Sequence, residues 1–251
     1  MTRYVWSDLA PRPAWQQMAL DHALLDRAER DGTTVLRLYR WDLPSISFGA
    51  NEAAARSWDR DRLERDAVPC VRRPTGGRAV WHAPDDLTYA VTGRLADFGG
   101  LKAAYQSIHE RFAARLTGIG LDATLAPAPS SIPGLEAGAC FDVAVGGEIL
   151  SGERKVVGSA QVVQGVGLLQ HGAVARADRL PLLERYRVTS RGEPVKAPIA
   201  DLPPVQILAM ALLRDWVDDG AEHAPDELTA WAEEATVKHL RYRSPAWTWR
   251  R

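Results

Sequence analysis

Strand-like segments clustered between stretches of helical periodicity constrain the fold of this chain more than any other feature. Apolar residues recur at helical spacing over residues 14–30 and 101–116, and residues 53–65, 205–217 and 226–240 also fit helices. Short segments rich in Val, Leu and aromatic residues predict strands between and after them. These segments are residues 34–41, 45–48, 67–72, 79–82, 87–91, 123–125, 141–145, 154–163 and 167–174. Strands grouped in this way predict an α+β fold with a mixed or antiparallel sheet.

The chain has 251 residues, which is long enough for one substantial core. Residues 126–138 are rich in Pro, Gly and Ser, but strand-like sequence resumes directly after them, so they indicate a loop rather than a linker. We therefore expect a single domain over residues 1–251, with C-terminal helices from about residue 203.

Composition excludes several functional classes. The 31 basic and 32 acidic residues nearly cancel, so no nucleic-acid partner is expected. No run approaches the roughly 18 apolar residues of a membrane span, and the N-terminus has charges and prolines where a signal peptide needs an apolar run. Cys70 and Cys140 lack the spacing of a zinc site or a disulfide scaffold, so no metal is expected. These features predict a cytoplasmic protein that has no membrane association.

Cys140 and Lys155 are the first candidates for chemistry. They lie fifteen residues apart in a segment that reads as two short strands joined by a turn, which would bring the thiol and the ammonium together. A nearby cation lowers the pKa of a thiol and makes it nucleophilic. Spacing alone also fits a buried cysteine and a solvated lysine, and it favours that simpler interpretation.

A second candidate is the glycine loop, which we define as Arg72 to His82 (RRPTGGRAVWH). Adjacent glycines let a backbone approach a ligand closely, and the arginines around them suit a phosphate or a carboxylate. The spacing fits neither a phosphate-binding loop nor a dinucleotide fingerprint. Taken alone, Gly76-Gly77 between two strands more often forms a hairpin turn.

The segment KVVGSAQ is the third candidate. Strand alternation places Lys155, Val157 and Ser159 on one face, and Val156, Gly158 and Ala160 on the other, where small residues leave room for an elongated ligand. The segment does not fit the nucleophile elbow of serine hydrolases. His82 and His171 are each either an acid–base group or a hydrogen-bonded core histidine, and the second interpretation is the more common one.

Taken in order, RRPTGGRAVWH, CFD, KVVGSAQ and LLQHG resemble the lipoate/biotin protein ligase superfamily, from about Leu36 to Val174. Within it the chain looks most similar to the cysteine-dependent octanoyltransferases. The resemblance implies the class II synthetase-like catalytic fold shared by biotin and lipoate ligases. It also implies octanoyl-acyl carrier protein as donor, and a lysine of a lipoyl domain or of the glycine-cleavage H protein as acceptor.

The resemblance also assigns roles to residues. Cys140 would attack the donor thioester, and Lys155 would lower the pKa of the Cys140 thiol and hold the acyl carbonyl. Gly76, Gly77, Gly158 and Ala160 would line the acyl channel, and we expect Arg72 and Arg73 near the donor's pantetheine phosphate or acidic surface. The full substrate-binding set is Arg72, Arg73, Thr75, Gly76, Gly77, Arg78, Val80, His82, Gly158, Ser159, Ala160, Gln161, His171 and Gly172. No cofactor is required.

Three alternatives stay open. An ATP-dependent lipoate or octanoate ligase would use ATP and Mg²⁺, but ligases usually carry a third glycine where this chain has Arg78. A lipoyl-amide transferase could use the same residues, and a non-catalytic homologue would only dock partners. Ala83, Glu52 and residues 143–147 depart from the family pattern, and they affect donor or acceptor identity more than the nucleophile.

Overall fold

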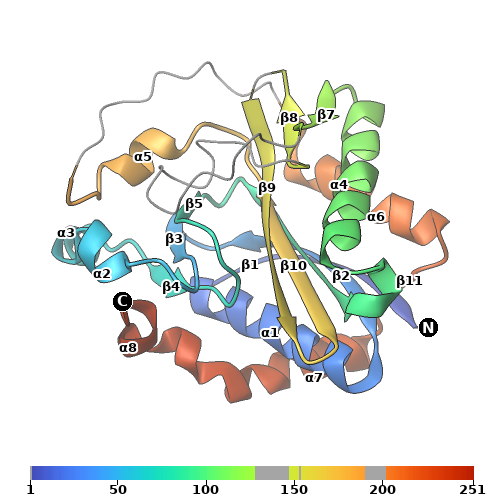
Figure 1. Ribbon diagram of the computed structural model, residues 1–251, viewed down its shortest axis with the longest axis horizontal. Coiled ribbons are helices and arrows are strands. Elements are labelled where there is room, and N and C mark those ends of the chain that lie inside the picture. The colour runs from blue at the N-terminus through green and yellow to red at the C-terminus, as the bar shows by residue number, and fades with distance from the viewer. Residues whose placement is uncertain (1, 128–146, 153, 190–201) are drawn as a thin grey trace.

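The computed structural model describes residues 2–127, 147–152, 154–189 and 202–251 (Figure 1). Its strands form an eight-stranded sheet in the order β11-β1-β2-β6-β10-β9-β8-β7, beside a three-stranded sheet in the order β4-β3-β5. In the large sheet β1 runs parallel to β2 and β11, and the other neighbouring pairs are antiparallel. The strands are β1 Arg3–Arg12, β2 Thr34–Trp41, β3 Ser45–Phe48, β4 Cys70–Arg72, β5 Val80–His82, β6 Leu87–Arg94, β7 Ala123–Leu125, β8 Ile149–Ser151, β9 Arg154–Gln164, β10 Gly167–Val174 and β11 Glu222–His223.

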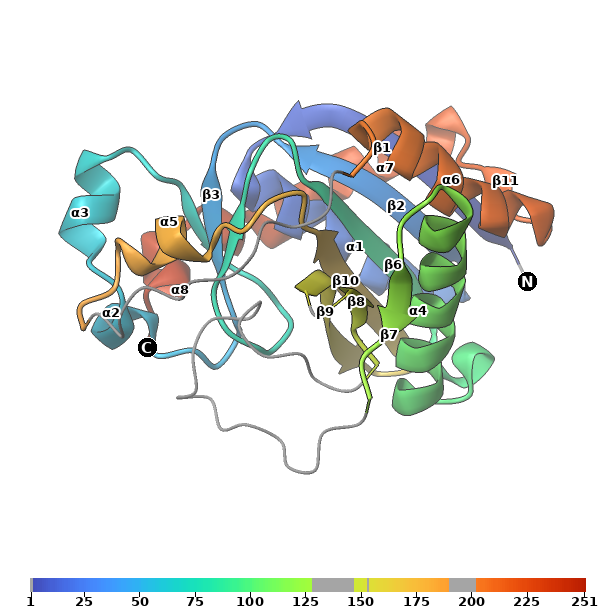
Figure 2. The ribbon, with the colours of Figure 1, turned by 90° about the horizontal axis from the view of Figure 1, so that it is seen from above.

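Helices cover both faces of the large sheet (Figures 1 and 2). Phe112 of α4 and Leu212 of α6 pack on one face, whereas α1, α7 and the 3-10 helix η2 cover the other. A strand covered on both faces is buried along nearly its whole length, as β2 is. The helices are α1 Ala14–Asp31, α2 Ala54–Ser57, α3 Arg60–Arg65, η1 Leu95–Phe98, α4 Leu101–Gly118, α5 Leu180–Glu184, α6 Val205–Asp218, α7 Asp226–Ala235, η2 Thr236–Arg243 and α8 Pro245–Thr248. This architecture confirms the predicted α+β fold.

Several predicted elements differ in detail. The helix expected over residues 53–65 is two short helices, because Trp58 is extended and Asp59 caps α3 by accepting from the Arg62 backbone N–H at 3.0 Å. The helix expected over 226–240 continues beyond Ala235 as a 3-10 helix. The strand expected from residue 67 begins at Cys70, since Ala67 has a left-handed φ of 51°. In the part of the chain that is described, no helix has both the length and the apolar character that a membrane span needs.

The hairpin interpretation of Gly76-Gly77 is wrong. The glycine loop begins at the last residue of β4 and ends with β5. These two strands do not pair with each other, because β3 lies between them and pairs with both. The loop therefore crosses over the end of β3 instead of closing a two-stranded ribbon. This crossover brings the loop beside β10, where it contributes to a cavity.

Candidate active site

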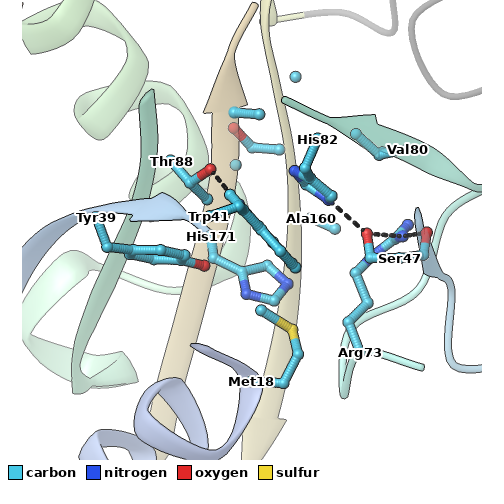
Figure 3. Close-up of a pocket in the computed structure, with 14 residues that line it drawn as sticks. Met18, Tyr39, Trp41, Ser47, Arg73, Val80, His82, Thr88, Ala160 and His171 are labelled. Atoms are coloured by element: carbon cyan, nitrogen blue, oxygen red, sulfur yellow. Dashed lines mark hydrogen bonds between the residues drawn. The ribbon is translucent and has the colours of Figure 1, made fainter. Parts of the chain in front are cut away.

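A pocket lies between the three-stranded sheet and the strands β9 and β10 (Figure 3). It encloses about 390 Å³, part of it open to solvent. Its walls are Met18, Tyr39, Trp41, Ser47, Arg73, Val80, His82, Thr88, Gly158, Ser159, Ala160, His171, Gly172 and Ala173.

Small residues on β9 and β10 make this space. Gly172 pairs with Ser159 across the two strands, and a Cβ atom on Gly172 would lie 2.4 Å from both the Gly158 carbonyl oxygen and Ser159 Oγ. A larger side chain there would therefore displace backbone as well as side chains. Gly158 and Ala160 continue the same small-residue surface, as the KVVGSAQ pattern predicts.

His171 connects the pocket wall to the glycine loop. Its Nδ1 lies 2.9 Å from Asp21 Oδ2 and its Nε2 lies 2.6 Å from Thr75 Oγ1. A carboxylate only accepts, so Nδ1 carries a hydrogen and donates it to Asp21, while Nε2 is hydrogen-bonded to the Thr75 hydroxyl. Thr75 therefore fixes the glycine loop on helix α1 through the His171 ring.

His82 is buried beside the pocket and leaves one polar atom without a partner. Its ring stacks on Trp41 with centroids 3.9 Å apart, and its Nε2 lies 2.8 Å from Ser47 Oγ. Burial, together with the charge of Arg73 and the neighbouring His171, holds the pKa of His82 well below its usual range, so the ring is neutral at pH 7. Among the described pocket walls, His82 Nδ1 is the one buried polar side-chain atom that lacks a hydrogen bond. A polar group of a ligand would satisfy it.

The arginines of the glycine loop have structural contacts. Arg72 is fully buried, and its guanidinium donates to the carbonyls of Gly49 at 2.7 Å, Glu52 at 2.8 Å and Thr248 at 3.0 Å. Backbone thus encloses the charge of Arg72, and its expected place near the donor's pantetheine phosphate or acidic surface stays a prediction. Arg73 lines the pocket, but it too donates to carbonyls, including those of Gly76 and Arg78, both at 2.7 Å.

Lys155 forms a buried ion pair near the start of β9. Its Nζ lies 2.7 Å from Glu148 Oε1, and each side chain is 3% exposed. A surface lysine, the simpler alternative for Lys155, is thereby excluded. Cys140 lies outside the described residues. The other cysteine, Cys70, is largely buried, and burial raises the pKa of its thiol to about 12, which makes it a poor nucleophile.

A directed chain of hydrogen bonds runs behind the pocket. Tyr89 Oη lies 2.5 Å from Ser159 Oγ, which lies 2.7 Å from His109 Nε2. His109 Nδ1 lies 2.7 Å from the carbonyl of Gly147 and must donate to it, so Nε2 accepts from Ser159. Burial and the charge of Lys155 lower the pKa of His109 to about 4, which keeps the ring in this neutral form.

A second histidine cluster lies away from the pocket. The potential ligand atoms of His22, Asp26 and His239 all lie within 4.8 Å of one another. The two imidazole rings are stacked at an interplanar angle of 25°, so their in-plane lone pairs run nearly parallel and do not converge on one ion. Arg241 also donates to His22 Nδ1 at 3.0 Å. The arrangement fits two stacked neutral rings, each hydrogen-bonded to other residues, better than a metal centre.

The structure thus brings part of the predicted set together. Eight predicted binding residues line the pocket, namely Arg73, Val80, His82, Gly158, Ser159, Ala160, His171 and Gly172. Six others do not line it, namely Arg72, Thr75, Gly76, Gly77, Arg78 and Gln161. Sequence reasoning missed Asp21, Tyr89, His109 and Glu148. Asp21 is signalled weakly, as a carboxylate on an otherwise apolar helix face; the others carry no local signal.

Comparison with known proteins identifies relatives of this chain. The family model for the lipoyl protein ligase A/B catalytic domain matches residues 13–195. The octanoyltransferase LipM of Halalkalibacterium halodurans is 30% identical over an alignment that covers 100% of both chains. LipM of Kyrpidia tusciae is 33% identical over 93% of this chain and 94% of its own.

Solved structures agree in fold. The crystal structure of lipoate-protein ligase A bound with ATP superposes with a TM-score of 0.78 over 99% of both chains, at 22% identity. LipL1 of P. falciparum in complex with lipoate gives 0.73 over 99% of this chain and 74% of that one, at 15% identity. With the match of the family model and the similarity to two relatives over nearly the whole chain, this protein belongs to the lipoyl protein ligase A/B catalytic-domain family.

Proposed function

We propose that this protein is an octanoyltransferase of lipoate biosynthesis. It moves an octanoyl group from acyl carrier protein, through a thioester on Cys140, to a lysine of a lipoyl domain such as the glycine-cleavage H protein. The observation that carries the proposal is the similarity, over the whole chain, to relatives that are octanoyltransferases. The buried ammonium of Lys155 and the small-residue pocket support it.

The pocket suits a saturated acyl chain. Gly158, Ala160 and Gly172 present no large side chain to the pocket, and Met18 and Tyr39 provide apolar wall. Lys155 precedes Gly158 by three residues on β9, which is about 10 Å along a strand. Lys155 is not one of the pocket walls, so in this proposal the chain lies along the small residues and its carbonyl carbon lies at the end of the pocket toward Lys155.

The chemistry needs a thiol and a cation. Cys140 displaces the carrier thiol, which leaves with a proton, in a nearly neutral exchange of thioesters. The neutral amine of the acceptor lysine then attacks the acyl carbon, the C–S bond breaks, and Cys140 leaves as a thiol that carries the proton lost by the amine. Formation of the amide drives this second step. A thiol with a pKa of about 8.5 is roughly 3% thiolate at pH 7, and a decrease of about two units makes it mostly thiolate. Nucleophilicity falls with pKa, so the net gain is nearer tenfold.

Intact-mass measurement tests the proposal. The protein is incubated with octanoyl-carrier protein and no ATP, and we expect one octanoyl adduct that hydroxylamine removes. Adding a lipoyl domain should discharge the adduct and octanoylate the domain.

The adduct should disappear in Cys140→Ser and persist in Cys70→Ser, which removes the other thiol. Modification of the lipoyl domain only when ATP is present would overturn the proposal in favour of a ligase. If neither reaction occurs, the protein only docks its partners. Repeating the measurement with a lipoyl donor distinguishes octanoyl transfer from lipoyl transfer.

A further inference from the structure

Glu148 is buried in direct contact with Lys155, although no sequence motif includes it. The two side chains are each 3% exposed, and Glu148 Oε1 lies 2.7 Å from Lys155 Nζ. Glu148 directly precedes β8, whereas Lys155 is near the start of β9, so the pair joins the two strands of one ribbon. Burying two charges is costly unless each has a well-placed partner.

The backbone on both sides of Glu148 is fixed. Its carbonyl accepts from the N–H of Ala126 at 2.7 Å, and the N–H of Gly147 donates to the Ala126 carbonyl at 2.8 Å. The carbonyl of Gly147 accepts from His109 Nδ1 at 2.7 Å. Gly147 has a φ of 89°, and a Cβ atom there would lie 3.3 Å from the ring of Tyr105. These contacts fix the place from which the Glu148 carboxylate reaches Lys155.

The groups around the pair explain why this carboxylate matters. On the described elements, His109 of α4 and Tyr89 of β6 lie beside the pair, and both are neutral at pH 7, because burial lowers the pKa of His109 to about 4 and raises that of Tyr89. The neighbouring Arg154 is paired with Asp178 at 3.0 Å. A buried amine keeps its proton only where a negative charge compensates for the lost water.

We propose that Glu148 is a positioning residue whose carboxylate keeps Lys155 charged and in place for acyl transfer, and that His109 secures Glu148 through the Gly147 carbonyl. The inference rests on the proposed function only for the identity of the reaction. The transfer needs an ammonium at a fixed position, both to favour the thiolate and to hold the acyl oxygen. Glu148 keeps the Lys155 amine protonated and holds it in a fixed position, and it does so without touching the substrate.

Glu148→Gln tests the charge, because it keeps the shape and removes the negative charge. The chain has four lysines, at positions 102, 155, 196 and 238, so ¹⁵N-lysine labelling gives a simple spectrum, and Lys155→Arg assigns the signal. We expect the pH midpoint at which the Lys155 ammonium signal is lost to fall by about one unit or more in Glu148→Gln, since a buried cation loses its proton more easily when the negative charge 2.7 Å away is removed.

The rate of acyl-enzyme formation should follow. In Glu148→Gln we expect a decrease of at least about tenfold at pH 8, with the alkaline limb of the pH profile moved to lower pH and the KM for octanoyl-carrier protein nearly unchanged. Glu148→Asp keeps the charge on a shorter side chain, so it should keep the wild-type limb and midpoint while the rate falls. Glu184→Gln is the matched control, because it removes the carboxylate at the end of α5 that pairs with Arg187. It should match the wild type in both measurements.

An unchanged Lys155 midpoint in Glu148→Gln overturns the inference, and so does a Glu148→Asp protein that behaves like Glu148→Gln. Where circular dichroism shows that Glu148→Gln does not fold, Glu148→Asp alone decides, and a lowered Lys155 midpoint in that protein overturns the inference. If the wild-type protein forms no acyl-enzyme, the proposed function fails, and the lysine titration still decides the role of Glu148.

Discussion

Arg37 is the centre of a buried network of charges. Its side chain is fully buried and donates to Asp8 Oδ2 at 2.6 Å and to Asp21 Oδ1 at 2.8 Å. It also lies over the ring of Tyr39, 4.1 Å from the centroid. Because Asp21 also accepts from His171, the position of the pocket wall depends on this guanidinium.

Removing the positive charge of Arg37 should strongly lower the stability of the fold. Arg37→Met leaves the carboxylates of Asp8 and Asp21 buried without it, so we expect the free energy of unfolding in urea to fall by about 3–5 kcal/mol. Arg60→Met is the matched control, because it breaks an exposed pair with Glu64, and there we expect a change of about 1 kcal/mol or less. Equal effects of the two substitutions would contradict a structural role for the buried network.

The glycine loop and the end of β3 touch backbone to backbone. A Cβ atom on Gly49, directly after β3, would lie 1.8 Å from the carbonyl oxygen of Gly77. Gly77 itself has a φ of 88°, which favours glycine. Gly76 differs, since a Cβ atom there meets no atom within 4 Å.

These contacts predict opposite outcomes for two alanine substitutions. Gly49→Ala should lower the melting temperature and abolish acyl transfer, because backbone atoms would have to move. Gly76→Ala should fold like the wild type, so any loss of its activity would report on the ligand instead of the fold. Thermal unfolding followed by circular dichroism checks both, and a stable Gly49→Ala protein would show that the loop can shift without cost.

Sequence patterns predicted where helices and strands lie in the chain better than which strands pair in the sheets. The strands at residues 34–41 and 45–48 have the predicted boundaries, since turn residues delimit them on both sides. β1 was missed because Pro11 and charged residues interrupt its pattern, and it is buried only in part. The position of β3 between β4 and β5 is a long-range pairing that no local pattern contains.

The same reason separates the site residues that were predicted from those that were missed. Ser159, Ala160, His171 and Gly172 meet because β9 and β10 pair in register, which two neighbouring strand motifs suggest. His109 reaches the site from helix α4, and its role comes from how that helix packs on the sheet. Such contacts are a property of tertiary packing.

At the scale of the whole molecule, buried neutral histidines make stability depend on pH. Burial lowers the pKa values of His22 and His109 to about 4, below the usual 6.5. Between these limits the unfolded chain binds more protons than the folded one, so the folded state loses stability as the pH falls. This loss of folding stability is absent above about pH 6.5 and is nearly complete at about pH 4.

Urea unfolding at pH 7 and pH 4.5 measures this effect. We expect each of the two histidines to account for roughly 2–3 kcal/mol of the decrease, an upper value because both rings keep some contact with water. His109→Gln should show a smaller decrease than the wild type, whereas substitution of the exposed His223 should not alter it. Identical pH dependence in wild type and His109→Gln would contradict a neutral buried His109.

The contacts of Arg72 with the last helix have a practical consequence. The carbonyl of Arg251 accepts from the N–H of Ala55 at 2.6 Å, Arg250 donates to the Ala50 carbonyl at 2.9 Å, and Trp249 packs edge-on against Phe48. The segment from Phe48 to Ala55, which lies beside the glycine loop, thus contacts Trp249, Arg250 and Arg251 near α2 (Figure 1). An affinity tag fused after Arg251 would emerge beside the residues that pack against the glycine loop, whereas a tag fused before Thr2 would lie on the opposite side of the molecule (Figure 1).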